Sequence, residues 1–499
     1  MAYTRRNTTD GVTIMNKDLY DNLQDGIDNT KEVFNMFRHG ADITGINPCD
    51  SVFNQALNSG LPIYFPKGIY SFKSKIDTTS SVIMYGDSKD NTIINFLPSS
   101  TEQDFFGIFT VGNFYCKDLC INLRVSKDCK FVNNSDSSGV FVITHGTTHI
   151  INSTIRTEET EGYPVRLVTM WSFSDDGGEF IFKSSEIYDY LTYPIGGGPL
   201  FISTSSSSLK GYDKVLVSDS LIYTEVQGEM LACWSVGTKK LKFGTIEYSN
   251  VTFITPNNRS MVASIYDLSC HSVLVKNCKT IIEGSGGTFI SVRNVDSDLE
   301  VFIEDCYYIS KGKSKISNFN IALTSNTKKV VIKGGHYHIE GCLNATISSK
   351  EAEVSDCYFY IGDCDTIYTY SSIYRCVVEA GSFSNSICYS SLYGCRIPVM
   401  VFAVGSGTTD PSRVTEIFDS DFITEAFCQK IGEQLIIRNS KGGLNFRYGK
   451  STYLYLFNNL FSVLRLQGVD ITEETLPNIA TKVVSIGNFN LEGNSYPST

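Results

Sequence analysis

Short stretches in which apolar and polar residues alternate recur along this chain, and each ends at a small residue before a second such stretch begins. The clearest copies are VFIEDCYYISKG around Cys306, VVIKGGHYHIEG around Gly335 and AEVSDCYFYIGD around Cys357. A period of two predicts β-strands, and the small residue between them predicts a tight corner. With weaker copies included, the corners fall at Cys120, Ser153, Ser185, Ser220, Asn250, Cys278, Cys306, Gly335, Cys357, Cys376, Cys395, Ser420, Ser440 and Asn459.

These corners are about 30 residues apart in the middle of the chain and about 20 residues apart later, which is a repeat with a drifting period. Such a repeat predicts a solenoid, because each unit buries its apolar side only against its neighbours. We therefore expect one long β-body, with Cys306, Gly335 and Cys357 stacked on consecutive turns. Three strands of about five residues with their corners need about 20 residues, so the longer turns are expected to carry loops.

Two helices are predicted ahead of the repeats. A short one is expected between Asp50 as its N-cap and Gly60 as its left-handed end. A longer one is expected from Asn16 to Arg38, and its apolar stripe favours self-association over docking on the body of the same subunit. The stripe consists of Leu19, Leu23, Ile27, Phe34 and Phe37.

Two segments resemble known families. The stretch from Gly40 to Tyr70, with GAD, DSVFNQALNSG and LPIYFPKGIY, resembles the entry segment of the pectate-lyase-like superfamily of right-handed parallel β-helices. The stretch from Thr4 to Asp28 resembles the N-terminus of bacteriophage tail spike and tail fibre proteins. Together they imply an all-β fold, a right-handed parallel β-helix preceded by an N-terminal α-helix. They also imply a homotrimer on the virion tail, made in the host cytoplasm, that binds and often cleaves host surface polysaccharide.

The chain is accordingly divided into four parts. Residues 1–39 are expected to form a helix for trimerisation and for attachment to tail or baseplate proteins, and residues 40–100 the capping helix and the entry to the β-helix. Residues 101–465 would form the β-helix body, and residues 466–499 a C-terminal cap.

Composition narrows the partners. A net charge of −11 argues against nucleic acid, because phosphate binding needs clustered Lys and Arg. No stretch resembles a signal peptide or approaches the ~20 apolar residues that span a bilayer, so no membrane insertion is expected. The 15 cysteines lack paired C-x-x-C spacing, and seven of them fall at or near the corners, so we expect stacked thiols rather than disulfides or zinc ligands. No metal and no cofactor is expected.

A second strand also aligns through the middle turns. If Ala232, Ala263 and Ile290 point inward, Trp171, Tyr266 and Arg293 point outward along the axis, where they suit an extended glycan or, alternatively, a subunit interface. In that alignment Trp234 has the opposite parity from Trp171, so one of the two tryptophans is expected in the core. Trp171, Tyr266, Arg293 and Trp234 are the candidate glycan-binding residues.

Glycoside hydrolysis needs two carboxyl groups about 5 Å or ~6.5–9.5 Å apart, close to one and two turns of a solenoid. The candidates are Asp175, Asp176 and Glu179, near Trp171 and a Gly-Gly turn, together with Glu229. Each could equally be a solvated surface carboxylate. A polysaccharide lyase would instead use a base such as Tyr or His. His336 and His338 share a strand face but have no third metal ligand.

The sequence therefore favours a phage tail spike subunit that recognises host polysaccharide. It leaves open whether the protein is an endo-acting glycoside hydrolase, a polysaccharide lyase or a non-catalytic receptor-binding or baseplate protein. A secreted bacterial polysaccharide lyase is a third alternative.

Overall fold

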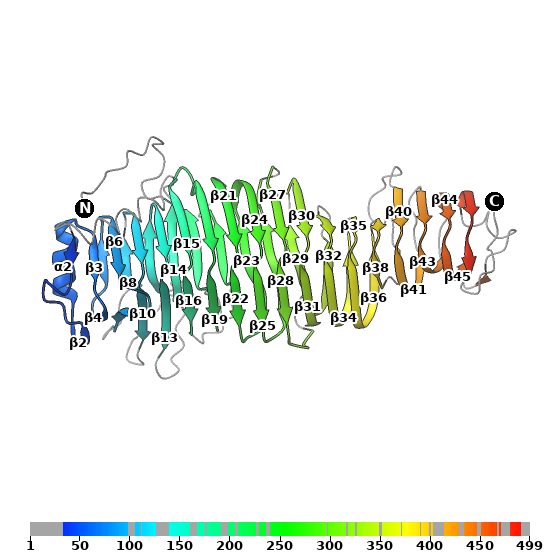
Figure 1. Cartoon of the computed structure of the whole chain (residues 1–499). Helices are drawn as coiled ribbons and strands as arrows, with labels where there is room; N and C mark the ends of the chain where they lie inside the picture. The colour runs from blue at the N-terminus through cyan, green and yellow to red at the C-terminus, as the bar shows by residue number, and fades with distance from the viewer. Residues whose placement is uncertain are drawn as a thin grey trace, which may run out of the picture.

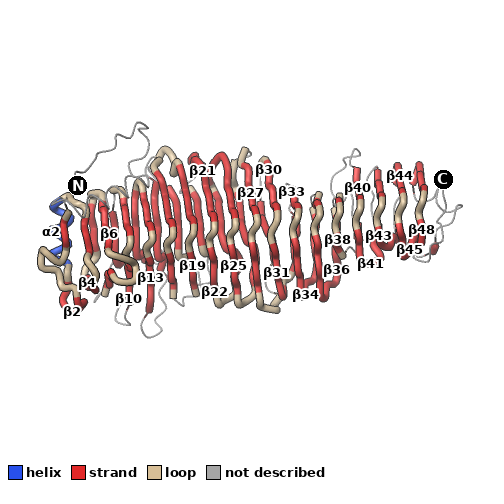
Figure 2. Tube along the Cα trace, viewed as in Figure 1, coloured by secondary structure: helices blue, strands red, loops and turns tan. Residues whose placement is uncertain are grey.

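Parallel strands stack turn upon turn along the described chain and form a rod with the N-terminal and C-terminal segments at opposite ends (Figures 1 and 2). This computed structural model confirms the predicted parallel β-helix. Each turn runs through three faces, here called face A, face B and face C in chain order. The structure describes residues 33–97, 105–110, 112–125, 139–159, 167–174, 177–190, 198–204, 208–225, 229–235, 240–296, 298–315, 318–324, 327–348, 352–370, 372–389, 391–398, 401–402, 414–428, 434–446, 451–466, 469–470 and 480–490.

Face A is one sheet, and faces B and C belong to a second sheet because β34, β36 and β41 continue from face B into face C. Face A consists of β1 (Phe34–Asn35), β3 (Ile63–Phe65), β6 (Val82–Gly86), β9 (Phe114–Lys117), β12 (Thr148–Ile151), β15 (Glu179–Lys183), β18 (Lys214–Ser218), β21 (Leu241–Ser249), β24 (Leu268–Lys276), β27 (Glu300–Glu304), β30 (Lys329–Lys333), β33 (Ala352–Ser355), β35 (Ile373–Tyr374), β37 (Leu392–Tyr393), β40 (Val414–Phe418), β42 (Gln434–Arg438), β44 (Ser451–Phe457) and β47 (Ala480–Ile486). Face B consists of β2 (Thr44–Pro48), β4 (Gly68–Phe72), β7 (Thr92–Phe96), β10 (Cys120–Val125), β13 (Thr154–Glu159), β16 (Glu186–Asp189), β19 (Leu221–Thr224), β22 (Thr252–Thr255), β25 (Lys279–Ile282), β28 (Tyr307–Ser310), β31 (His336–Gly341), β34 (Tyr358–Thr369), β36 (Val377–Cys388), β38 (Arg396–Ile397), β41 (Asp421–Cys428), β43 (Lys441–Phe446), β45 (Leu460–Leu466) and β48 (Phe489–Asn490). Face C consists of β5 (Ile76–Thr78), β8 (Phe105–Thr110), β11 (Gly139–His145), β14 (Leu167–Ser174), β17 (Leu200–Thr204), β20 (Leu231–Trp234), β23 (Arg259–Tyr266), β26 (Gly286–Arg293), β29 (Phe319–Thr324), β32 (Asn344–Ser348), β39 (Val401–Phe402) and the later halves of the long strands. β46 (Val469–Asp470) pairs antiparallel with β45.

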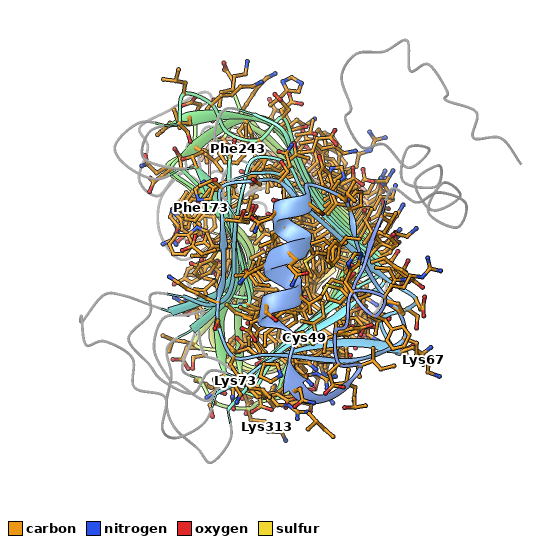
Figure 3. The ribbon with its side chains drawn as sticks, turned by 90° about the vertical axis from the view of Figure 1, so that its left-hand side faces the viewer. Cys49, Lys67, Lys73, Phe173, Phe243 and Lys313 are labelled. Atoms are coloured by element: carbon orange, nitrogen blue, oxygen red, sulfur yellow. The ribbon has the colours of Figure 1, made fainter. Side chains whose placement is uncertain are left out.

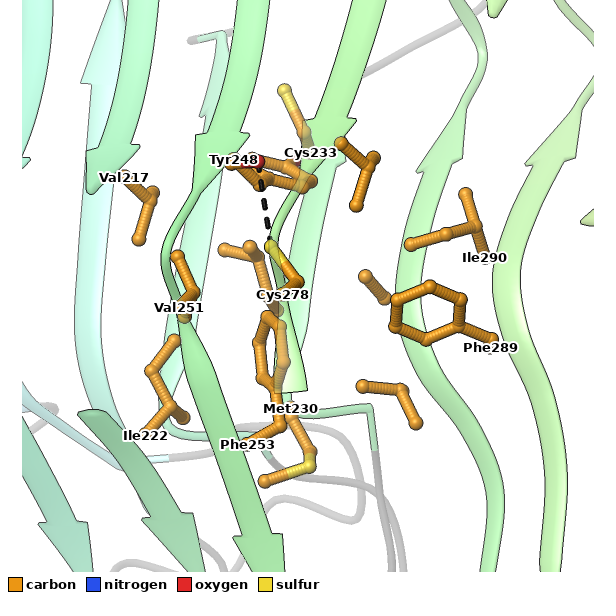
Figure 4. Packing of buried hydrophobic residues seen from close by; sticks show 14 of the residues in the cluster. Val217, Ile222, Met230, Cys233, Tyr248, Val251, Phe253, Cys278, Phe289 and Ile290 are labelled. Carbon is orange, nitrogen blue, oxygen red and sulfur yellow. Dashed lines mark hydrogen bonds between the residues drawn. The ribbon is translucent and has the colours of Figure 1, made fainter. Parts of the chain in front are cut away.

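Alternate side chains of every face fill the interior of the rod. In Figure 4 the core holds Val217, Ile222 and Phe289 from the three faces, and all of these are buried. The thiol of Cys278 donates a hydrogen bond to the carbonyl oxygen of Tyr248 at 3.4 Å. Period-two patterning therefore builds the core, because inward residues of one turn pack on those of the next.

Tight corners join face A to face B. The corner residue adopts a left-handed backbone at nearly every turn, for example Ser184 with φ 51°, Asp219 with φ 51° and Asn250 with φ 54°. Asn and Asp tolerate this conformation better than other residues with a side chain. The side-chain amide of Asn250 also donates to the carboxylate of Asp219 on the preceding turn, at 2.9 Å.

The residues that follow these corners stack inside the rod. The amide of His336 donates to the carbonyl oxygen of Cys306 at 2.9 Å, and the amide of Tyr358 donates to that of Gly335 at 3.1 Å. Cys306, Gly335 and Cys357 therefore lie on consecutive turns, as predicted. The cysteines whose side chains are described are all buried and free of disulfides.

One helix, α2 (Asp50–Ser59), lies across the N-terminal end of the rod (Figure 3). Its Val52, Phe53 and Ala56 are buried, and Gly60 ends it in the left-handed conformation. The prediction that Asp50 is the N-cap is wrong, because Cys49 holds that position. The Asp50 carboxylate instead accepts hydrogen bonds from the backbone amides of Lys73 and Ser74, at 3.2 and 2.8 Å.

The predicted long N-terminal helix lies mostly outside the described residues. Phe34, which was assigned to its stripe, lies in β1, where it is buried and pairs with Ile63. At the other end, β47 and β48 add a further turn within residues 466–499, for which a cap is predicted. None of the described helices is long and apolar enough to cross a membrane.

Candidate functional site

Face C carries a ladder of aromatic side chains that follows the axis of the rod. The strand register pairs Trp171 of β14 with Phe201 of β17 on the next turn. Trp234 of β20 pairs in the same way with Tyr266 of β23. These side chains point outward and are half-buried, whereas their neighbours Met170 and Cys233 are buried in the core. Figure 3, which looks along the rod, shows Phe173, which lies on β14 with Trp171, at the outer edge.

The rings of this ladder are in contact. The Trp171 centroid lies 5.4 Å from that of Trp234 and 5.9 Å from that of Phe201. Trp234 stacks on Tyr266 at 5.5 Å with an interplanar angle of 4°. The indole Nε1 of Trp171 donates to the hydroxyl of Ser203 at 2.7 Å, which fixes the ring plane. Trp171 is tilted by 48° to Trp234 and is nearly perpendicular to Phe201, at 88°. Half-buried rings in a row offer apolar surface along several turns.

The prediction that Trp171 and Trp234 have opposite parity is wrong. Trp171 pairs with Phe201 and Phe201 pairs with Ala232, so Trp234 lies two positions further on the same outward side. The predicted alignment of the strands treats Ala232 and Ala263 as equivalent, but in the structure Ala263 pairs with Leu231. A slip of one residue inverts every side chain of a strand.

Glu229 lies two residues before β20, beside this ladder. The hydroxyl of Ser264 donates to its Oε2 at 2.5 Å, and Arg293 Nη2 lies 3.9 Å from its Oε1. Burial raises the pKa of the Glu229 carboxyl above its usual range, and Ser264 and Arg293 oppose that rise only in part. Such a carboxyl holds a proton at higher pH than an ordinary glutamate, which suits proton donation.

Arg293 and Tyr266 complete the cluster. They are register partners on β26 and β23, and Arg293 is exposed at the end of the aromatic ladder. Burial, and secondarily the charge of Glu229, raise the pKa of Tyr266, so its hydroxyl stays neutral and can donate a hydrogen bond. Four predicted glycan-binding residues and one predicted catalytic residue therefore lie together. They are Trp171, Trp234, Tyr266, Arg293 and Glu229.

Glu179 lies elsewhere, at the start of β15 on face A. Its Oε2 is 3.4 Å from Nε2 of His149, whose side chain is 1% exposed. Contact with His149 lowers the pKa of Glu179, so this carboxylate is held in its ionised form. The edge of the His149 ring packs on Tyr115. Among the described residues, Glu179 therefore contacts His149 of face A and lies away from the aromatic ladder.

Two further predicted residues, Asp175 and Asp176, lie outside the described residues. The site also contains Phe173, Phe201 and Ser264, which are not among the residues predicted from the sequence. Alternation within β14 and β17 could have identified Phe173 and Phe201, since each has the parity of Trp171 once the register is right. Nothing in the sequence signals Ser264, whose role depends on a neighbouring turn.

Among the described residues no group of three His, Cys, Asp or Glu side chains could hold a metal ion. His336 and His338 instead stack on tyrosines of the next turn, with centroid distances of 4.7 Å to Tyr358 and 4.5 Å to Tyr360.

Comparison with known proteins agrees with the fold. Residues 33–115 match the family described as "Rhamnogalacturonase A/epimerase, pectate lyase-like". This match contains the segment Gly40 to Tyr70 on which the predicted resemblance depends. None of the curated proteins matches the chain.

Solved structures with a similar path include enzymes, an adhesin and a phage protein. The catalytic unit of the GH87 alpha-1,3-glucanase from Streptomyces thermodiastaticus strain HF3-3 is 14% identical, with a TM-score of 0.30 over 94% of this chain and 70% of that chain. PfbA, a surface adhesin of Streptococcus pneumoniae, is 11% identical, with a TM-score of 0.30 over 93% of each chain. The N-terminal fragment of bacteriophage Phi29 gene product 12 is 10% identical, with a TM-score of 0.23 over 97% and 98%. Similarities this low carry no functional weight by themselves.

Proposed function

We propose that face C binds an extended polysaccharide along the axis of the rod. The observation that carries this proposal is the ladder from Trp171 through Trp234 to Tyr266, whose contacting, half-buried rings give an apolar surface for the C–H faces of successive sugars. Arg293 at the end of the ladder supplies a cation for an acidic sugar substituent. Glu229 accepts hydrogen bonds from sugar hydroxyl groups when it is ionised.

A second candidate function is cleavage of the same polysaccharide, with Glu229 as the proton donor to the leaving glycosidic oxygen. The raised pKa of its carboxyl and its place against the aromatic ladder favour this role. Hydrolysis also needs a second carboxyl group to activate water or to attack the sugar. A lyase would use Arg293 to neutralise a uronate carboxylate, and a separate base.

We also propose the biological setting. The chain would be a tail spike subunit of a bacteriophage, assembled as a homotrimer and joined to tail or baseplate proteins through residues 1–39. The resemblance of Thr4–Asp28 to tail spike proteins and the apolar positions Leu19, Leu23 and Ile27 within that segment support this setting. The polysaccharide would then be a surface glycan of the bacterial host, contacted during adsorption.

Binding can be tested by affinity electrophoresis of the full chain in gels that contain purified bacterial capsular or cell-wall polysaccharides. We expect Trp234→Ala and Tyr266→Ala each to weaken retardation about tenfold, because each removes one stacking ring. Tyr374→Ala is the matched control, since Tyr374 stacks on Tyr393 at 4.7 Å on face A. Equal retardation of all three variants and the unaltered chain would rule out the ladder as the binding surface.

Cleavage needs a separate measurement. A polysaccharide that binds is incubated with the chain, and new reducing ends or the ultraviolet absorbance of an unsaturated uronate are recorded. If the chain is a hydrolase, Glu229→Gln should abolish product while binding persists. Product formation that is unchanged in this variant would remove Glu229 from the reaction, and absence of product from every bound polymer would leave the protein as a non-catalytic receptor-binding protein.

A further inference from the structure

Face B carries a separate aromatic cluster on β16 and β19. Tyr188 and Tyr223 are register partners on neighbouring turns, and Tyr190 follows β16 directly. The Tyr188 and Tyr190 rings are nearly parallel, at 5° and 5.9 Å, and Tyr190 lies 5.2 Å from Tyr223. All three point outward and are half-buried, whereas Ile187 and Asp189, which flank Tyr188, are buried. We call these three rings the tyrosine platform.

Charged side chains surround the platform, and the cations among them are already matched. Arg156 lies 5.2 Å above the Tyr188 ring, and its Nη1 is 3.5 Å from Glu158. Arg124 is also 3.5 Å from Glu158. Lys89 contacts Glu186, the first residue of β16, at 2.7 Å.

A carboxylate also holds one of the tyrosine hydroxyls. The hydroxyl of Tyr223 donates to Glu225 at 2.9 Å. Around the rings, Glu158 therefore contacts Arg124 and Arg156, Glu186 contacts Lys89, and Glu225 holds the Tyr223 hydroxyl. The surface is apolar at its centre, rich in hydrogen-bonding groups at its edge and balanced in charge.

The same outward row continues along face B without these features. Tyr223 is followed by Ile254, Ile281 and Ile309 on the next three turns. These turns show that aliphatic side chains are sufficient on the outer surface of this sheet. The row becomes aromatic again at His338 and Tyr360. A cluster of three rings with charged groups at its edge, as around Tyr188, is the arrangement expected of a ligand site.

We infer that the tyrosine platform is a second carbohydrate-binding site, and that it takes uncharged hexopyranose units. The rings cover the C–H face of the sugar, and the carboxylates and guanidinium groups at the edge hydrogen-bond to its hydroxyl groups. An acidic sugar gains no net attraction there, because its carboxylate would have to displace an existing ion pair. The platform shares no residue with the ladder on face C, so this inference goes beyond the function proposed above. Two sites on one rod would raise the affinity for a long polymer by linkage.

The test is affinity electrophoresis of the full chain in gels with dextran or hydroxyethyl cellulose, which are neutral, or with polygalacturonate, which is acidic. We expect at least one neutral polymer to retard the chain, and Tyr188→Ala with Tyr223→Ala to weaken that retardation about tenfold or more. Tyr360→Ala is the matched control, since Tyr360 lies further along the same outward row and stacks on His338. Circular dichroism of each variant confirms that it is folded.

Four outcomes would overturn the inference. The first is that neither neutral polymer retards the unaltered chain. The second is that Tyr360→Ala weakens retardation as much as the platform variant does. The third is that Trp234→Ala alone removes all retardation by the neutral polymers, which would place binding on face C. Loss of subunit association in the platform variant, measured by light scattering, would also overturn it, because the rings would then belong to an interface between copies. Retained retardation in Trp234→Ala with loss in the platform variant supports it, whatever becomes of the proposal for face C.

Discussion

At the scale of residues, two carboxyl groups chosen for the same role turn out to have opposite environments. Glu229 is partly buried beside aromatic rings, and its pKa is raised. Glu179 contacts His149 on another face, and its pKa is lowered. A carboxyl that keeps its proton can act as an acid, and one that stays ionised acts as a base or an electrostatic partner. The two residues therefore cannot serve as interchangeable candidates.

The raised pKa of Glu229 predicts a pH-dependent cost to stability. A carboxyl whose folded pKa is raised contributes most stability at acidic pH, and that contribution is lost as pH rises through the folded pKa. Glu229→Gln should therefore unfold at a higher temperature than the unaltered chain at pH 7, and the difference should shrink towards pH 4. Differential scanning calorimetry across that range checks this. Glu353→Gln, at a site that is 61% exposed, is the control and should show no such trend. A lower unfolding temperature for Glu229→Gln at pH 7 would contradict the assignment.

At the scale of elements, the corner between faces A and B sets where each turn begins. Left-handed residues such as Asp305 bend the chain, and the residue that follows, here Cys306, is buried in the core. This position accepts Cys and Ser at many turns but Gly at 335. Gly335 has φ 104°, and a Cβ there would lie 2.5 Å from the carbonyl oxygen of Cys306. The repeated corner thus tolerates a side chain only where the backbone angle allows one.

Gly335→Ala should destabilise the rod by about 2 kcal/mol or more, because the new methyl group meets backbone and the angle is unfavourable for a side chain. Gly60→Ala is the matched control: its φ of 66° is also left-handed, but no atom lies within 4 Å of an added Cβ. That variant should lose only about 1 kcal/mol. Urea unfolding followed by circular dichroism measures both. Equal losses would mean that contact with Cys306 has no influence.

At the scale of the whole molecule, the N-terminal end of the described strand stack is covered. The N-terminal end is covered by α2, whose Phe53 packs edge-on against Phe72 at 5.5 Å and lies 6.0 Å from Phe65. An open end would present unpaired strand edges and the core to another molecule. The short helix therefore keeps the stack from extending into a second copy.

Removing this cover should cause end-to-end association. We expect Phe53→Asp to undermine α2 and to give large aggregates in light scattering at concentrations where the unaltered chain keeps a fixed mass. Asn54→Asp, which adds the same charge at an exposed neighbouring position, is the control and should behave like the unaltered chain. A fixed mass for Phe53→Asp would show that α2 is not needed to block the end.

The sequence by itself determined the repeat, the corners and the stacking of Cys306 over Gly335, because alternation and small residues act locally and recur. It also identified Trp171, Trp234, Tyr266, Arg293 and Glu229 as candidates, but not their arrangement. Which residues of neighbouring turns are partners depends on the lengths of the loops between them, and these vary from turn to turn. Only the tertiary structure therefore decided that both tryptophans face outward, that Glu229 meets Ser264, and that Glu179 belongs to another face.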